Sequence, residues 1–231
     1  NGDIVRNMVA GNTVDPNVDT TGWVRESNEI IYASKYGLSN DSNSDQSEKL
    51  QNIANIAKSG SGMLVIDSLS EVVYAVMNVD ITGLHVEVSP SVSFIAPSSS
   101  TNEYAFIATG TSASLGRKTV LKNAHLDTQN RMKGVFYAEY VSEPEAHDCS
   151  VDNEDTSASL DGMGVQFKEC YKPGVIRGFY SGGRYGVMFN SCTNPVAQDV
   201  ETKGQGRDGI LFYTSVNGST TTDDVADNCT V

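Results

Sequence analysis

A repeat of about 22 residues limits what this chain can fold into more than any other feature. A glycine followed by an apolar residue recurs along the second half of the chain, at Gly134, Gly164, Gly186 and Gly209. A unit of this length with occasional loop insertions is typical of a solenoid, in which each repeat forms one coil. Five of the seven phenylalanines follow the same repeat, with successive spacings of 30, 31, 22 and 23 residues: Phe106, Phe136, Phe167, Phe189 and Phe212.

A second series marks one sharp turn in each coil. Asn, Asp and Gly tolerate the left-handed backbone of such a turn, and stacked copies can hydrogen-bond along the solenoid axis. We therefore expect a structural role for the turn residues, which are Asn123, Asp148, Gly178, Asp199 and Asn228. The alignment also predicts that the residues after four of these turns face the interior, namely Cys149, Phe179, Val200 and Cys229.

The charge balance narrows the classes of partner. The 231 residues include 29 acidic and 16 basic side chains, for a formal net charge of -13. Nucleic acid and anionic membranes would repel such a chain. No apolar stretch approaches the roughly 18 residues that a membrane-spanning helix needs. We therefore expect neither nucleic-acid binding nor membrane insertion, and the many Gly, Ser, Thr and Asn residues favour β structure with many turns.

The two ends suggest a piece of a longer protein. The chain does not begin with Met, and the repeat stops at Val231 within a strand. An unpaired strand edge at that point would promote aggregation. We therefore expect that the chain is a fragment truncated at residue 231.

The four cysteines lack the CxxC spacing of zinc and redox sites. Cys170 and Cys192 fall at the same offset after Phe167 and Phe189, which places them on neighbouring coils. Neighbouring strands lie about 4.8 Å apart, so the distance between these two cysteines allows a disulfide. We expect buried free thiols instead, because unpaired cysteine is among the most buried residue types.

The first third of the chain divides into two parts. Residues 1–28 carry many turn formers and are too few to fold alone. We expect a linker module that packs on other subunits or on the next domain, the alternative being a partly ordered linker. Residues 29–231 are predicted to form one domain, with a capping segment over 29–66 and coils from about residue 72.

The capping segment is predicted to hold one helix between strands. A strand is expected from Glu29 to Ala33, followed by a polar loop. Asp45 is then the predicted N-cap with Glu48 as its capping-box partner, and Gly60 ends the helix. Strands are expected over 63–66 and 72–76. The apolar face of the helix has the i, i+3, i+4, i+7 spacing and comprises Leu50, Ile53, Ala54 and Ala57.

Two stretches resemble known families. Residues 36–47 read YGLSNDSNSDQS, with Leu50-Gln51 in the helix and Gly60-Ser61-Gly62 before an apolar strand. This string resembles the opening of pectin-lyase-like right-handed β-helices. Residues 1–5, 15–19 and 21–24 resemble a linker module that precedes the β-helix in bacteriophage tailspikes and tail fibres. Together the two resemblances cover about the first 66 residues.

The resemblance implies an all-β fold, a right-handed parallel β-helix with a short N-terminal capping helix. It implies a homotrimeric receptor-binding protein of the phage tail, placed in the virion outside the host cell, whose N-terminal module contacts the tail or another tail protein. The implied function is to recognise and depolymerise a bacterial surface polysaccharide, capsule or lipopolysaccharide, during host adsorption, as a glycoside hydrolase rather than a lyase. The active site can lie on coils outside these residues. A non-enzymatic adhesive tail component and a secreted pectin-lyase-like enzyme stay open as alternatives.

Polar residues after the turn strands are expected to gather at one edge of the solenoid. Hydrolysis of a glycosidic bond needs two carboxylates, about 5 Å apart in retaining and about 6.5 to 9.5 Å apart in inverting enzymes. We predict Glu201 with Asp208 or Asp155 as this pair. Sugar contacts are predicted from Tyr180, Arg184, Tyr185 and Arg207, because aromatic rings stack on sugars and Arg binds uronate or sulphate. The remaining members of the predicted groove are Asp127, Arg131, Asp152, Glu154 and Lys203.

Other chemistry has little support in the sequence. A lyase would need a base beside a uronate that Arg neutralises, and Arg184 and Arg207 are the candidates for that role. His85, His125 and His147 are expected to be solvated surface residues. The sequence contains no HExxH, P-loop, GxSxG or dinucleotide-binding fingerprint. We therefore expect neither a metal nor a cofactor.

Overall fold

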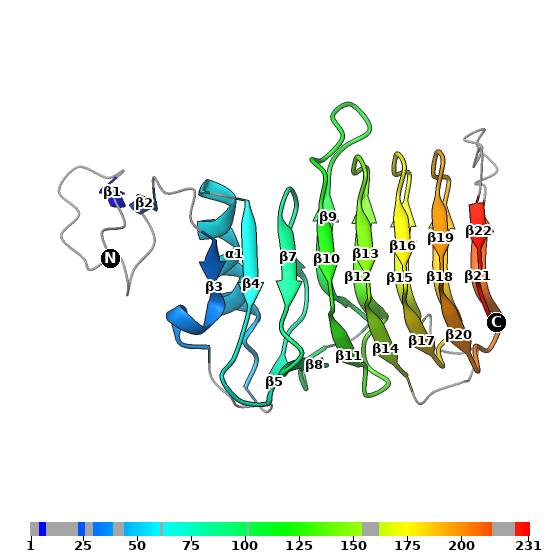
Figure 1. Ribbon diagram of the computed structural model, residues 1–231, viewed down its shortest axis with the longest axis horizontal. Coiled ribbons are helices and arrows are strands. Elements are labelled where there is room, and N and C mark those ends of the chain that lie inside the picture. Colours follow the sequence, from blue (N-terminus) through cyan, green and yellow to red (C-terminus); the bar gives the residue numbers. More distant parts are fainter. Residues whose placement is uncertain are drawn as a thin grey trace.

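The chain folds into a right-handed parallel β-helix of about 6 turns. The computed structural model describes residues 5–7, 23–25, 30–38, 44–60, 62–100, 102–153, 162–213 and 225–231, with 5–7 and 23–25 described by their backbone only. Three parallel sheets run along the long axis of the molecule, and each coil contributes one strand to each of them (Figure 1). The predicted fold class is confirmed.

Sheet 1 has eight strands in the order β22-β19-β16-β13-β10-β7-β4-β3. Along the chain they are β3 (Ile31–Tyr32), β4 (Met63–Ile66), β7 (His85–Val88), β10 (Val120–Lys122), β13 (Glu145–His147), β16 (Gly174–Ile176), β19 (Val196–Gln198) and β22 (Val225–Asp227).

Sheets 2 and 3 have six strands each, and each coil runs from sheet 1 to sheet 2 and then to sheet 3. Sheet 2 contains β5 (Val72–Ala75), β8 (Val92–Ile95), β11 (His125–Asp127), β14 (Ser150–Asp152), β17 (Phe179–Ser181) and β20 (Glu201–Lys203). Sheet 3 contains β6 (Val79–Asp80), β9 (Tyr104–Thr109), β12 (Gly134–Glu139), β15 (Met163–Lys168), β18 (Tyr185–Asn190) and β21 (Asp208–Tyr213).

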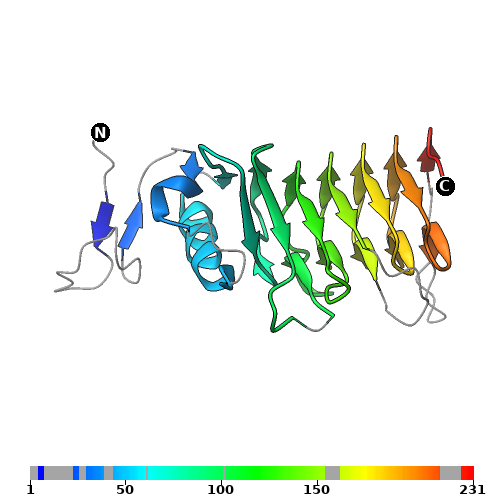
Figure 2. The same ribbon diagram turned by 90° about the horizontal axis from the view of Figure 1, so that it is seen from below.

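Helix α1 (Ser47–Ser59) lies at one end of the stacked coils (Figure 2). The predicted apolar face is buried against that end. The predicted capping box is wrong by one residue, because Gln46 holds the N-cap position and makes no side-chain cap bond. The Asp45 carboxylate accepts a hydrogen bond of 2.9 Å from the Ser47 backbone N–H instead, so it still satisfies a donor of the first turn.

The N-terminal part is described only in pieces. Strands β1 (Val5–Asn7) and β2 (Trp23–Arg25) form an antiparallel pair. The rest of the predicted linker module, residues 1–28, lies outside the described residues, so this boundary stays a prediction. The strand predicted from Glu29 is shorter in the structure, since the 3₁₀ helix η1 (Ala33–Tyr36) follows β3 directly.

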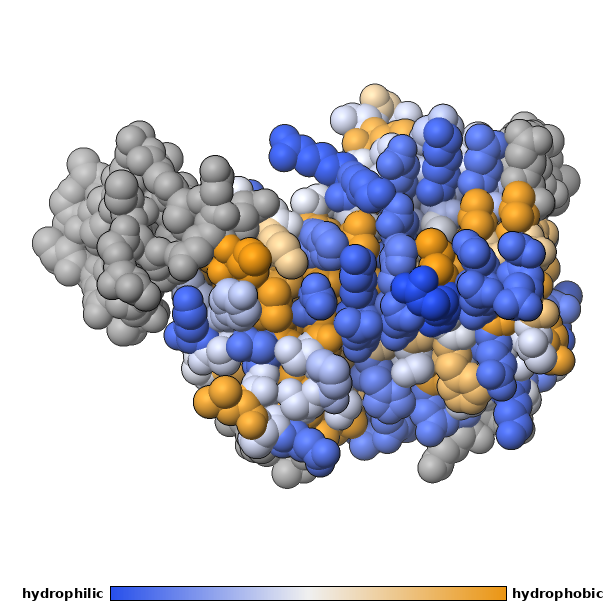
Figure 3. All heavy atoms as spheres, in the orientation of Figure 1, coloured by the Kyte–Doolittle hydropathy of each residue, from blue (hydrophilic) through white to orange (hydrophobic). Residues whose placement is uncertain are grey.

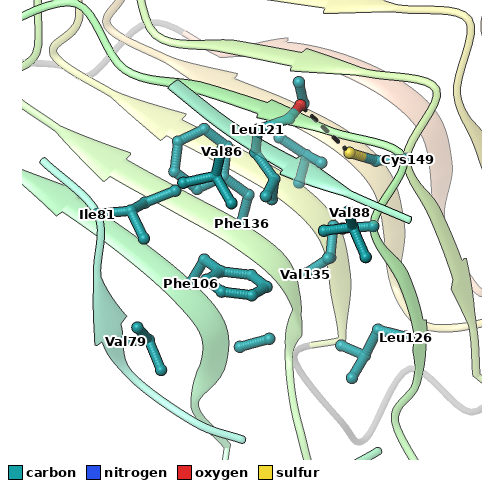
Figure 4. Packing of buried hydrophobic residues seen from close by; sticks show 14 of the residues in the cluster. Val79, Ile81, Val86, Val88, Phe106, Leu121, Leu126, Val135, Phe136 and Cys149 are labelled. Atoms are coloured by element: carbon teal, nitrogen blue, oxygen red, sulfur yellow. Dashed lines mark hydrogen bonds between the residues drawn. The ribbon is translucent and has the colours of Figure 1, made fainter. Parts of the chain in front are cut away.

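The interior is filled by apolar side chains from all three sheets. Val86 and Leu121 of sheet 1, Leu126 of sheet 2, and Phe106 and Phe136 of sheet 3 are all fully buried (Figure 4). Burial of such side chains contributes about 25 cal/mol per Å² of apolar surface removed from water, which is the main driving force of this fold.

The phenylalanine series consists of two ladders that are offset by two residues. Phe106 pairs with Phe136, and Phe167 pairs with Phe189, as predicted. Between the two ladders Phe136 lies opposite Val165, so Phe167 has moved two positions along its strand. Because side chains alternate between the two sides of a strand, a shift of two keeps the ring inside. The rings of Phe136 and Phe167 still meet edge to face, with centroids 5.6 Å apart.

The corner between sheets 1 and 2 is a single left-handed residue in each of five coils, as the turn series predicts. One assignment is wrong, since the third of these residues is Arg177 and not Gly178. Arg177 has φ 53 and lies one place before Gly178, which takes the inward position. Phe179 consequently faces outward and is 41% exposed, contrary to prediction. The five corner residues have φ between 49 and 59 and are Asn123, Asp148, Arg177, Asp199 and Asn228.

Two side-chain links run along this corner. The Arg177 guanidinium donates to both carboxylate oxygens of Asp148, at 2.8 Å each, and the Asn228 amide donates to Asp199 at 2.5 Å. The expected hydrogen bonding along the axis is therefore present between these coils. The bond from Arg177 is the main reason why the pKa of Asp148 is lowered.

The four cysteines are free thiols, as predicted. Cys149, Cys170 and Cys192 are buried, whereas Cys229 in the last strand region is partly exposed. The Cys149 Sγ donates to the Leu121 carbonyl at 3.6 Å (Figure 4). Burial raises the pKa of Cys149 to about 12, so its thiol stays protonated at neutral pH.

Candidate functional site

The outer face of sheet 2 gathers polar side chains from four successive coils. Along each strand the middle residue points into the core and its two neighbours point outward. The strands are in register, so the outward residues form two columns. The first column is His125, Ser150, Phe179 and Glu201, and the second is Asp127, Asp152, Ser181 and Lys203.

Asp127 and Asp152 form a pair of neighbouring carboxylates on this face. They lie directly opposite each other on adjacent strands, where the strand spacing is about 4.8 Å. One oxygen of Asp127 accepts the Gln129 backbone N–H at 2.9 Å, and one oxygen of Asp152 accepts the Ser181 hydroxyl at 2.8 Å. The second oxygen of each has no hydrogen bond within the described part of the chain. The strand spacing is close to the separation of about 5 Å that a retaining glycosidase uses.

The first column places an aromatic ring beside a Ser–His pair. The Ser150 hydroxyl lies 2.7 Å from Nδ1 of His125. Phe179 follows Ser150 in the column, and its ring is accessible to solvent. The sequence analysis missed Phe179 because it placed the corner at Gly178 instead of Arg177 and therefore predicted that Phe179 faces inward. The tandem Phe179-Tyr180 was the available signal, since only one of two consecutive strand residues can face the core.

Tyr180 is the inward residue of that tandem, so its predicted sugar contact is wrong. The side chain is 1% exposed. The ring fills space that Gly164 and Gly178 leave open, because a Cβ on either glycine would come within 2.5 Å of ring atoms. Burial raises the pKa of the Tyr180 hydroxyl. Tyr180 is therefore a core residue of the β-helix.

Tyr185 lies beneath two arginines at the corner between sheets 2 and 3. The guanidinium carbons of Arg184 and Arg207 are 5.3 and 5.9 Å from its ring centroid, and Arg207 donates to the Tyr185 hydroxyl at 2.9 Å. Only 6% of Tyr185 is exposed. Its ring therefore supports the two guanidinium groups by cation–π contact and is not open to stack on a sugar.

The predicted carboxylate pair is split between two surfaces. Glu201 lies on the outer face of sheet 2, next to Phe179. Asp208 begins β21 in sheet 3, where its carboxylate is 3.8 Å from Nε of Arg207. Asp155 and Glu154 lie outside the described residues. The structure thus brings Glu201 to the face of Asp127 and Asp152, and brings Asp208 to Arg184 and Arg207.

Other members of the predicted groove occupy the same region. Lys203 ends the second column of sheet 2. Arg131 lies in the turn after β11, where it donates to the Ala96 carbonyl at 3.1 Å and contacts the Gln129 side chain. This arginine is therefore held by its own turn and by the preceding coil.

The histidines are less uniform than predicted. His125 is exposed on sheet 2, as expected. His147 on sheet 1 is half-buried, and its Nε2 lies 2.8 Å from the Glu145 carboxylate, which Lys118 also contacts at 2.6 Å. His85 on the same sheet has a buried Nε2 without a hydrogen-bond partner in the described chain, and burial is the main cause that lowers its pKa.

Figure 3 shows one side of the molecule coloured by hydropathy. Over the stacked coils this side is mostly hydrophilic, with hydrophobic side chains scattered singly among charged ones. Scattered apolar residues are normal on soluble surfaces. Within the described ranges no group of three or more His, Cys, Asp or Glu side chains is arranged to hold a metal ion. Among the helices described here, none has the length and apolar character to span a membrane.

No protein-family model and no curated protein sequence matches the chain. Solved structures match its fold. A protein from Parabacteroides merdae ATCC 43184, described as a proposed glycosyl hydrolase, aligns with a TM-score of 0.62 and 10% identity over 86% of this chain and 96% of its own. Tailspike protein 3 of bacteriophage CBA120 aligns with a TM-score of 0.53 and 9% identity over 96% of this chain.

The chain therefore shares its parallel β-helix fold with these two structures. ORF18 of Geobacillus virus E2 shares the fold as well, with a TM-score of 0.55 and 14% identity over 87% of this chain. This chain spans 48% of the ORF18 chain and 39% of the tailspike chain. At these identities the likeness concerns the fold and transfers no individual residue.

Proposed function

We propose that this β-helix belongs to a phage tail protein that binds and cleaves a bacterial surface polysaccharide during adsorption. The observation that carries the proposal is the outer face of sheet 2. Two aligned carboxylates, an exposed ring and a lysine stand there in strict register on four coils. A polysaccharide is itself a repeating ligand, so a regular row of such groups suits it. The fold shared with a tailspike and with a proposed glycosyl hydrolase supports the same function.

Glycoside hydrolysis is the reaction that these side chains fit best. In a retaining mechanism one carboxylate attacks the anomeric carbon while the other protonates the leaving oxygen, and the second then activates the water that releases the sugar. Asp127 and Asp152 have the strand separation for these roles. Glu201 with Asp155 or Asp208 is the alternative pair, as predicted from the sequence.

Substrate contacts are proposed on both sides of the carboxylates. Phe179 offers a ring face for a sugar, and Arg184 and Arg207 offer guanidinium groups for a uronate carboxylate or a sulphate. The assembly is proposed to be a homotrimer whose N-terminal module faces the virion. The sequence resemblance supports these last two points.

Cleavage is tested by incubating the protein with capsular polysaccharide and lipopolysaccharide of candidate hosts. New reducing ends without ultraviolet absorbance from unsaturated uronates indicate a hydrolase, and both signals together indicate a lyase. Asp127→Asn and Asp152→Asn are expected to lower the rate by a factor of about 100 or more, because each removes a general acid, base or nucleophile. Glu201→Gln and Asp208→Asn test the alternative pair.

The matched control is Glu87→Gln, which neutralises a carboxylate on sheet 1 and should leave the rate unchanged. Binding of host glycan without any new reducing end would replace the hydrolase by a non-enzymatic adhesin. If the Phe179→Ala variant no longer binds the glycan and the Glu87→Gln variant still does, the glycan binds on sheet 2. Absence of both binding and cleavage would refute the proposed function.

A further inference from the structure

A hollow of about 470 Å³ lies at the corner of the β-helix opposite sheet 2. It sits where the loop between β9 and β10 rises from the coil, at the top of Figure 1, next to the C-terminal turn of α1. Its walls combine glycines, hydroxyl side chains and two cations with one leucine. They are Lys58, Thr82, Gly83, Thr109, Gly110, Thr111, Ser114, Leu115, Gly116 and Arg117.

The glycines determine the shape of this hollow. Gly110 and Gly116 hold the two ends of the loop against each other and against the next coil, because a Cβ on Gly110 would come 2.1 Å from the Tyr140 carbonyl and 2.3 Å from the Gly116 nitrogen. Gly83 has φ 78, and the Arg117 side chain passes close to the position of its missing Cβ. The loop is therefore closely fitted, and Arg117 extends along the floor beside Gly83.

Arg117 is the one cation of this corner without a carboxylate partner among the described residues. Lys58 is paired with Asp80 at 2.8 Å. Lys118 points away from the hollow, to Glu145 at 2.6 Å and Glu143 at 3.7 Å. The hollow consequently carries one uncompensated positive charge on a chain whose net charge is -13.

The hydroxyl groups divide into engaged and open ones. The Thr82 hydroxyl donates to Asp80 at 2.6 Å and accepts the Thr109 backbone N–H at 2.9 Å, so it is occupied. The Thr111 hydroxyl is taken up by Ser114 backbone atoms. The hydroxyls of Thr109 and Ser114 have no partner within the described chain. They remain open to a ligand that carries hydroxyl groups of its own.

We propose that this hollow binds one acidic sugar unit, with its carboxylate on Arg117 and its hydroxyls on Thr109 and Ser114. A single free guanidinium matches a single carboxylate with charge-assisted hydrogen bonds. The open hydroxyls match a polar ligand, and the volume lies in the range of small-molecule sites. This inference rests on the proposed function and deepens it, because it names uronate-type sugars as the glycan class and adds a binding site remote from sheet 2.

The test compares methyl β-glucuronide with methyl β-glucoside, which differ in the carboxylate, using dissociation constants from ligand-observed NMR. The glucuronide should bind about tenfold more tightly or better, as expected for a charge-assisted pair. Arg117→Gln should abolish this difference. Lys118→Gln removes the neighbouring charge, which points away from the hollow, and should preserve it. Leu115→Glu adds an anion at an exposed lining position and should also weaken glucuronide binding.

Equal binding of the two glycosides by the wild-type chain would overturn the inference, as would equal losses in Arg117→Gln and Lys118→Gln. Thermal unfolding of the variants checks that each one is folded. If Arg117→Gln is unfolded, the weaker glucuronide binding expected of Leu115→Glu tests the site instead. The proposed function is judged separately by the polysaccharide assay with the Asp127 and Asp152 variants. Cleavage with equal glycoside binding refutes the acidic-sugar site alone, and glucuronide selectivity without glycan binding or cleavage refutes the proposed function alone.

Discussion

Two corners of the same β-helix differ in how much their length varies from coil to coil. From β10 onward, the corner between sheets 1 and 2 has the same length in each coil, with one left-handed residue followed by one further residue before the strand of sheet 2. The corner between sheets 2 and 3 spans residues 128–133, 153–162, 182–184 and 204–207 in successive coils, so its length changes each time. The constant corner keeps the strands in register, and the variable corner accepts changes without disturbing them. Arg184 and Arg207 lie at the variable corner, which is where new contacts can be built at low cost to the fold.

The largest effect is expected from Gly178→Val at the constant corner. A Cβ at this position would lie 2.5 Å from the ring of Tyr180, which has no space to move in the core. Overpacking of this kind costs about 3 kcal/mol or more of the free energy of unfolding. Urea unfolding of the variant measures it.

Gly174→Ala is the matched control for this substitution. A Cβ at Gly174 would meet only the Glu145 side chain at 3.7 Å, which is an ordinary contact. Its stability should change little. If both variants unfold at the same urea concentration as the wild-type protein, the packing role assigned to the constant corner is incorrect.

An intermediate effect, on binding rather than stability, is expected from Arg207→Ala at the variable corner. Arg207 is largely exposed and its main contact is Tyr185. Loss of a contact arginine typically costs more than about 1 kcal/mol of binding energy, or roughly tenfold in affinity for an acidic glycan. Glycan binding and thermal unfolding are measured on the same sample. A large fall in melting temperature with unchanged affinity would reverse the roles of the two corners.

The smallest effect is expected from Arg177→Ala, which removes a cation from the constant corner. The pair with Asp148 is exposed to solvent, so its loss should lower the stability at neutral pH only slightly, with no change in glycan affinity. Because the folded state lowers the pKa of Asp148, the stabilisation is present above the ordinary aspartate pKa of about 3.9 and is lost as the pH falls below it. Urea unfolding at several pH values should show the two proteins converging in acid. A difference that stays constant down to strongly acidic pH would contradict the role of the ion pair.

Much of the fold follows from periodicity alone. Strand 63–66, the buried face of α1 and four of the five corner residues match the sequence prediction, and the strand predicted over 72–76 ends one residue earlier. The sequence analysis did not assign Arg177 to the corner, because a left-handed backbone is uncommon for residues other than Gly, Asn and Asp. It assigned the neighbouring Gly178 instead. The two-residue offset between Phe136 and Phe167 escaped it because a shift of two leaves the inward pattern unchanged.

The candidate site was less predictable than the fold. The charged residues that gather near sheet 2 were identified, but the surface on which each one lies depends on register. An error of one position in the predicted corner exchanged the inward and outward directions of Phe179 and Tyr180. Glu201 and Asp208 lie on different sheets because a corner separates them, and no local sequence pattern predicts the direction of that corner. The Arg117 hollow had no signal, since it depends on how a loop of one coil overhangs the turn of the coil before it.

The direction of the inter-strand hydrogen bonds has a mechanical consequence. In all three sheets these bonds link one coil to the next and so run along the long axis of the molecule. Tension applied between the two ends is therefore carried by the coil interfaces in series, like the links of a chain. The force at which such a rod yields is set by its weakest single interface and not by the sum of all of them, and the Arg177–Asp148 and Asn228–Asp199 links each reinforce one interface only.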